Sequence, residues 1–159
     1  MSRYGVLVAR IKNELATLDQ VVQTARSQVQ KGQATEDPDF YQAAALSLQN
    51  YYMGAERIFE EVAKQIDQSL PTGANSHQAL LQQMGLNIPQ TRPALLSDQT
   101  CELINDYRAF RHVVIHRYGF ELQPKRIGEL VDQLVNCHAN FSREVEDFCQ
   151  FLLKLDAAI

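Results

Sequence analysis

The residues best suited to chemistry lie in one stretch, residues 108–120, which reads RAFRHVVIHRYGF. Histidine gains and loses a proton near neutral pH, so it can take a proton from a ribose 2′-hydroxyl and return one to the leaving oxygen. Arginine is permanently charged and planar, so it can hold a phosphate and stabilise the charge of its transition state. The stretch therefore predicts cleavage of RNA by transesterification, a route that requires no metal. Its polar members are Arg108, Arg111, His112, His116, Arg117 and Tyr118.

The spacing of these residues indicates an incomplete site. On an ideal helix His112 and His116 stack on one side, whereas Arg111 and His116 lie about 140° apart. An arginine and a histidine so placed can face one ligand only near a helix end or in a groove shared with another surface. A cleft between two copies of the chain would surround one phosphate with two arginines and two histidines, so we expect a homodimer.

A different interpretation of the stretch stays open, because basic residues near a helix end also form surface patches that interact with the negative end of the helix dipole.

The other aromatic and histidine residues have structural explanations. His138 falls in a hydrophobic seam and is predicted to be buried and hydrogen-bonded. His77 stands alone in a polar segment and receives no role. Tyr51 and Tyr52 are expected in the core or an interface.

The charge distribution limits how the chain can meet nucleic acid. The formal net charge is −4, so its average field does not attract a polyanion. Residues 108–126 nevertheless hold five arginines and lysines against one acid, Glu121. Any contact with nucleic acid must therefore be local, although a solvated charged face would show the same composition.

Length and composition predict one globular domain over residues 1–159, because 45% of the residues are apolar and 21% charged. Cys101, Cys137 and Cys149 are odd in number and lack C-x-x-C spacing, which indicates buried thiols in a reducing compartment rather than a disulfide framework or zinc site. The first apolar run is too short for a signal peptide, and no stretch reaches membrane-spanning length. We therefore expect a cytoplasmic protein with no membrane contact.

Apolar residues at spacings of three and four predict helices throughout, and no segment shows a period of two. The expected fold class is all-α, an antiparallel bundle of four main helices plus a short helical insert. The main helices are expected from Tyr4 to a cap at Gly32, from Asp37 and Pro38 to Ile66, from Ser97 or Asp98 to about Gly119, and from Pro124 to Leu155, with the insert between Ser76 and Gly85.

Arg111, His116 and Tyr118 together form an R-x4-H-x-Y pattern that resembles the HEPN ribonucleases of the HepT toxin type. The residue after the arginine is commonly polar in that superfamily; here it is His112, where Asn would be more usual. The stretch YYMGAERI at residues 51–58 strengthens the likeness. The resemblance in architecture covers essentially the whole chain.

This resemblance implies a HEPN-like bundle that dimerises so that two motifs meet in one cleft. This dimer would be a metal-independent endoribonuclease without a cofactor that cuts mRNA or tRNA. It would act as the toxin of a bacterial toxin–antitoxin pair. Arg111 and His116 would be catalytic and His112 supporting, while Arg108 and Arg117 would contact RNA. The alternative is a non-catalytic helical HEPN module that binds nucleotide or substrate for a partner nucleotidyltransferase.

The same resemblance implies a regulatory partner, an MNT-type minimal nucleotidyltransferase that acts as the antitoxin. It would use ATP to transfer one or more AMP groups to Tyr118. Phosphates added beside Arg111 and His116 would occupy the anion site and repel RNA, so Tyr118 would be the point of inactivation.

Overall fold

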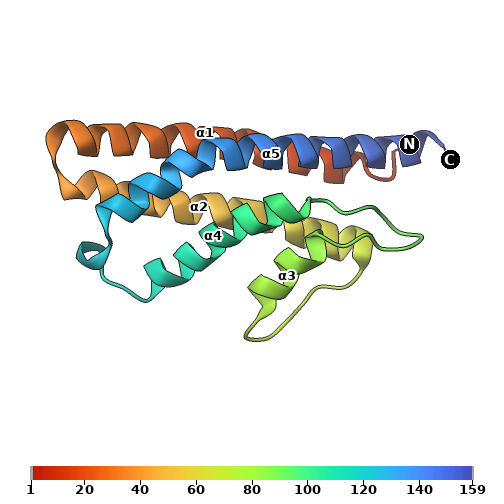
Figure 1. Cartoon of the computed structure of the whole chain (residues 1–159). Helices are drawn as coiled ribbons and strands as arrows, with labels where there is room; N and C mark the ends of the chain where they lie inside the picture. Colours follow the sequence, from red (N-terminus) through yellow and green to blue (C-terminus); the bar gives the residue numbers. More distant parts are fainter. Residues whose placement is uncertain (1, 159) are drawn as a thin grey trace.

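Four long helices and one short helix form the fold in the computed structural model, which describes residues 2–158 (Figure 1). No β-strand occurs among these residues, and the predicted all-α class with four main helices and a short insert is confirmed. The helices are α1 (Gly5–Thr35), α2 (Pro38–Val62), α3 (Ser76–Met84), α4 (Asp98–Ile115) and α5 (Pro124–Ala157); a π-helical turn, Ala63–Asp67, extends α2, and a 3-10 turn, Gly119–Glu121, precedes α5.

Successive long helices run in opposite directions, and α2 lies at the centre (Figure 1). Helices α1 and α5 lie side by side along one side of α2, while α3 and α4 cover the other side. Both chain ends therefore meet at one end of the bundle, where the Asp156 carboxylate accepts hydrogen bonds from the backbone amides of Arg3 (3.1 Å) and Tyr4 (3.0 Å). These bonds satisfy amides at the start of α1, which lacks a side-chain cap of its own.

The centre of the bundle is built on aromatic residues of α2 and α5. Tyr51 contacts the edges of Tyr107 and Phe141 with ring centroids 6.0 and 6.3 Å apart. His138 is 8% exposed; its Nδ1 lies 2.8 Å from the Tyr51 hydroxyl, and its Nε2 contacts the Asp19 carboxylate. The prediction of a buried, hydrogen-bonded histidine is therefore confirmed.

Two helix starts follow the predicted capping chemistry. The Asp37 carboxylate accepts a hydrogen bond from the Asp39 amide at 3.0 Å, with Pro38 at the first helical position. At α4, the Ser97 hydroxyl accepts from the Thr100 amide at 3.2 Å, so Ser97 rather than Asp98 is the cap.

The predicted cap at Gly32 is wrong. Helix α1 continues to Thr35, and Glu36 adopts the left-handed conformation (φ 55°) that ends it. Gly32 is buried inside the helix, where an added Cβ would lie 2.7 Å from Cε2 of Tyr41 on α2. The glycine therefore permits close packing of α1 against α2.

The segment after α2 is anchored by a buried ion pair that the sequence pattern did not predict. Asp67, in the π-helical turn, binds the guanidinium of Arg92 with an Nε to Oδ1 distance of 2.6 Å. The backbone amides of Leu95 and Leu96 donate to the Met84 carbonyl at 2.9 and 3.2 Å. These contacts hold the irregular crossing between α3 and α4 against the end of α2.

Candidate functional site

The rotation of α4 about its axis is set by its buried side. Ile104, Tyr107 and Phe110 lie at spacings of three and are at most 7% exposed. The Tyr107 hydroxyl donates to the Leu130 carbonyl of α5 at 2.7 Å, which fixes the helix to its neighbour. Because 3.6 residues complete a turn, His112 projects from the opposite side, and it is exposed.

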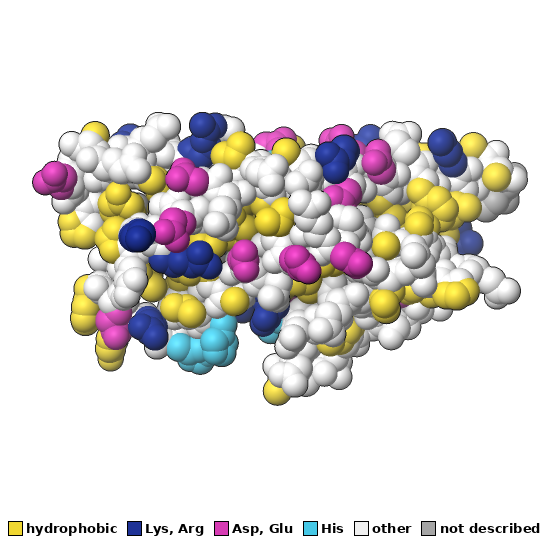
Figure 2. Space-filling view, viewed as in Figure 1, with side chains coloured by type: hydrophobic (Ala, Val, Ile, Leu, Met, Phe, Trp, Pro, Cys, Tyr) yellow, Lys and Arg dark blue, Asp and Glu magenta, His cyan; other side chains and the backbone are white. Residues whose placement is uncertain are grey.

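Two of the predicted site residues form a contacting pair at the C-terminal end of α4. The ring centroids of His112 and His116 are 4.4 Å apart and their planes are inclined by 59°. Both side chains are exposed, and Figure 2 shows histidine side chains gathered on the surface over this part of the molecule. The helix ends at Ile115, and His116 keeps one backbone hydrogen bond, to the Val113 carbonyl at 3.2 Å. The predicted stacking of these histidines is therefore observed at a helix end.

The two arginines on this part of α4 differ in their contacts. Arg108 donates from Nε to the Asn105 side chain at 2.7 Å. Arg111 is half-buried, and its side chain makes no hydrogen bond or ion pair with any other residue in the range 2–158. Its guanidinium therefore keeps its donors for an anion.

Helices α2 and α3 add polar groups beside these arginines. The Tyr52 hydroxyl is buried and has no hydrogen-bond partner within the described chain. Burial raises the pKa of Tyr52, the charge of Glu56 raises it further, and the positive charges of Arg108 and Arg111 oppose the rise. The tyrosine therefore lies within electrostatic range of the carboxylate and of both guanidiniums.

The prediction that His77 stands alone in a polar segment is wrong. His77 lies in the first turn of α3, and its Nδ1 is 2.8 Å from Oε2 of Glu56. The Glu56 side chain is only 12% exposed. The sequence could have indicated that Tyr52 and Glu56 lie together. They are four residues apart in YYMGAERI and therefore share one side of α2.

Tyr118 lies beyond the helix in an exposed turn. Its side chain is 72% exposed and stacks on Phe120, with ring centroids 5.6 Å apart and planes within 5° of parallel. The Tyr118 amide donates to Oε1 of Glu121 at 2.9 Å, which holds the turn. Gly119 begins the 3-10 turn rather than ending α4, which stops at Ile115. The turn presents the tyrosine ring to solvent.

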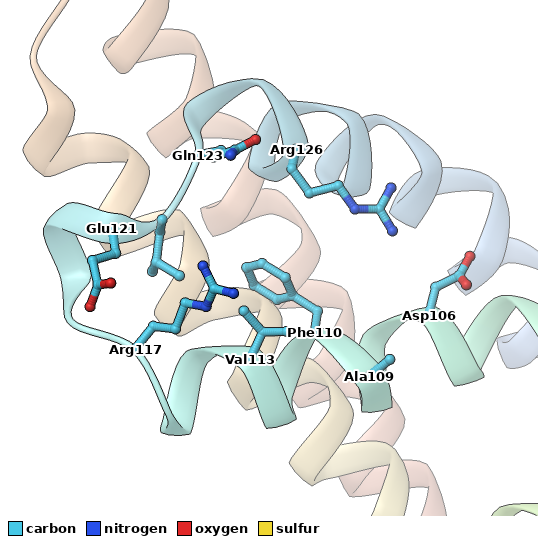
Figure 3. A pocket seen from close by; sticks show the side chains of 9 residues that line it. Asp106, Ala109, Phe110, Val113, Arg117, Glu121, Gln123 and Arg126 are labelled. Atoms are coloured by element: carbon cyan, nitrogen blue, oxygen red, sulfur yellow. The ribbon is translucent and has the colours of Figure 1, made fainter.

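The structure does not bring Arg117 together with the histidine pair. Its side chain lines a pocket of about 280 Å³ between α4 and the start of α5, where Arg126 enters from the other wall (Figure 3). Val113 and Phe110 form the α4 side of this pocket. The basic residues at the end of α4 therefore lie on two sides of the helix, with the histidine pair on one side and Arg117 on the other.

The cysteines and the possibilities of a metal site and a membrane span concern the rest of the chain. Cys137 and Cys149 are buried, and burial raises the pKa of their thiols to about 12 and about 11; Cys101 is only half-buried, and its pKa is also about 11. Within residues 2–158, no group of three or more histidine, cysteine or acidic side chains could hold a metal ion. None of the helices described here has the length and apolarity needed to cross a membrane.

Comparison with known families identifies the family of this chain. A family model described as "HepT-like protein" matches residues 43–152, which include the whole Arg111–Tyr118 motif and helices α3 and α4. No curated protein and no solved structure gave a match. The match covers well over half of the sequence, and it agrees with the R-x4-H-x-Y motif and with the helical fold. The chain therefore belongs to the HepT-like family of HEPN-type toxin modules.

Proposed function

We propose that this protein is an endoribonuclease toxin whose catalytic groups are Arg111 and His116. The observation that carries the proposal is the contacting pair of exposed imidazoles at the end of α4, on the same helix as a guanidinium that has no partner among residues 2–158. Together these groups supply proton transfer and an anion site. RNA provides both the hydroxyl and the phosphate on which they would act.

In the proposed reaction, the ribose 2′-oxygen attacks the neighbouring phosphorus and the bond from phosphorus to the 5′-oxygen breaks. His116 takes the proton of the 2′-hydroxyl or returns one to the 5′-oxygen, and the partner copy's motif supplies the complementary transfer. Arg111 stabilises the charge that develops on the phosphate oxygens. His112, in contact with His116, orients its ring. The products are a 2′,3′-cyclic phosphate and a 5′-hydroxyl.

A homodimer cleft is supported by the surface around the motif. Ile115 is 50% exposed, Phe120 81% and Val113 38%, so exposed apolar side chains occur within the motif and the turn that follows it. Exposed apolar groups that gather in one place are typical of interaction surfaces. A second copy seated there would cover these side chains and bring a second set of catalytic groups to the same phosphate.

The test is incubation of the purified protein with end-labelled single-stranded RNA in the presence of EDTA. We expect cleavage fragments that carry 2′,3′-cyclic phosphate ends. The competing function is a non-catalytic HEPN module that binds nucleotide or substrate for a nucleotidyltransferase. RNA that is retained by the protein but stays intact would favour that module and contradict the ribonuclease.

We further propose that an MNT-type nucleotidyltransferase inactivates the toxin at Tyr118. The exposed hydroxyl would attack the α-phosphorus of ATP, forming a tyrosyl–AMP bond and releasing pyrophosphate. After incubation with that partner and ATP, the intact mass should rise by whole AMP increments, and RNA cleavage should fall. The Tyr118→Phe variant should gain no mass, whereas Tyr4→Phe, a matched change at the far end of the bundle, should gain it. Mass increments on Tyr118→Phe would place the modification elsewhere.

A further inference from the structure

The pocket between α4 and α5 lies outside the Arg111 and His116 site. It has a volume of about 280 Å³, close to the lower limit of about 300 Å³ for small-molecule sites, so it accommodates one compact group rather than a length of polymer. Figure 3 shows the side chains of Arg117 and Arg126 reaching into it from the turn and from α5, with Phe110 between them.

The walls of the pocket combine three kinds of group. Val113 and Leu122, with the small exposed part of Phe110, give an apolar surface. The two guanidiniums supply permanent positive charge: Arg117 has no ion pair within residues 2–158, and Arg126 has only a long, exposed contact of 3.8 Å with Glu129. Such an exposed pair contributes little and leaves the arginine available for an anion.

The acceptors in the pocket complete the set. Asp106 and Gln123 line it beside the arginines. The Glu121 carboxylate also lines it, but its Oε1 is already used by the Tyr118 amide. A ligand that matches all three kinds of group has a flat apolar ring, a phosphate, and hydroxyl or amino donors. A ribonucleotide unit has all of these, and proteins recognise unpaired RNA by stacking on aromatic and guanidinium planes and by contacts to the 2′-hydroxyl.

The chain position of Arg117 connects this pocket to the proposed reaction. His116 and Arg117 are consecutive at the end of α4, yet His116 contacts His112 on one side and Arg117 lines the pocket on the other. We infer that the pocket binds one nucleotide that flanks the cleaved bond, so that the RNA strand passes round the C-terminal end of α4. This inference rests on RNA being the substrate of the proposed function.

The experiment measures binding of fluorescent oligo(A) and oligo(U) RNA to the full-length His116→Ala protein, with and without Arg126→Gln. Loss of a guanidinium that holds a phosphate should weaken binding about tenfold and reduce the salt slope, log K against log salt, by about 0.7. Lys125→Gln is the matched control, because it removes the same charge one residue away and Lys125 does not line the pocket. Its effect should stay within about twofold.

A second variant tests the pocket without a change in charge. Ala109 is exposed and lines the pocket, so Ala109→Phe should fill it, weaken binding about tenfold and leave the salt slope unchanged. Equal effects of Arg126→Gln and Lys125→Gln would overturn the inference. Free AMP is the second probe: if its binding depends on Arg126 while RNA binding does not, the pocket is a mononucleotide site and the strand path is wrong.

The cleavage assay on the wild-type protein separates this inference from the proposed function. Cleavage that is insensitive to Arg126→Gln would overturn the flanking-nucleotide pocket alone. If the RNA stays intact and its binding is weakened by Arg126→Gln, the ribonuclease proposal would be overturned. The nucleotide pocket would still be supported.

Discussion

Replacement of His116 by alanine is expected to abolish RNA cleavage while the protein stays folded. A positioned acid or base contributes typically 10² to 10⁴-fold to such a reaction, so the rate should fall by about that factor. The cost to folding should be small, because the His116 side chain is exposed. Initial rates on labelled RNA measure the first expectation, and thermal unfolding together with gel filtration measures the second.

His112→Ala is the matched comparison, since it deletes the other imidazole of the same contacting pair. The proposed roles require a smaller loss in this variant than in His116→Ala, because His112 only orients its neighbour. An unchanged rate for His116→Ala would contradict the proposed mechanism directly. A larger loss for His112→Ala would exchange the roles of the two histidines.

The helices were predictable because their apolar spacings, proline starts and polar caps all indicate the same structure. Asp37 and Pro38 define the start of α2 by local chemistry alone. Gly32 was misjudged because a glycine near an expected helix end is usually a cap, whereas here it makes room for the Tyr41 ring, a contact set by tertiary packing. Local signals cannot reveal which helix will approach a glycine.

The candidate site was predictable in residue types and only partly in arrangement. Helix periodicity places His112 beside His116, and the structure shows that contact. The separation of Arg117 from the histidines depends on where α4 ends, and the sequence suggested Gly119 rather than Ile115. Spacing places Tyr52 and Glu56 on one side of α2, but their position near Arg108 and Arg111 depends on the packing of α2 against α4, which no spacing within a single helix could indicate.

Arg92→Ala is expected to give the largest loss of stability, although Arg92 lies outside the Arg111–Tyr118 motif. Its guanidinium donates five hydrogen bonds: two to the Asp67 carboxylate (2.6 and 2.8 Å) and three to backbone carbonyls of Leu86, Pro93 and Gln83 (3.1, 3.0 and 3.1 Å). The side chains of Arg92 and Asp67 are 0% and 2% exposed.

Removal of one partner of a buried ion pair typically costs about 3–5 kcal/mol, because the remaining charge is left in a medium that solvates it poorly. The free energy of unfolding of Arg92→Ala, measured by urea titration with an unchanged m-value, should fall by about that amount. A loss below about 1 kcal/mol would show that water reaches Asp67 and that the ion pair is not an anchor.

The double variant Asp67→Ala/Arg92→Met separates the ion pair from the rest of the loop. It removes both charges and keeps much of the arginine's volume, so its loss of stability should be smaller than the sum of the two single losses. The three backbone carbonyls still lose their donor, so recovery should be incomplete. Cleavage per folded molecule should remain unchanged, because the pair binds the end of α2 to the crossing before α4, whereas the proposed catalytic groups lie at the opposite end of α4. A lower rate per folded molecule would mean that the crossing determines the position of the motif.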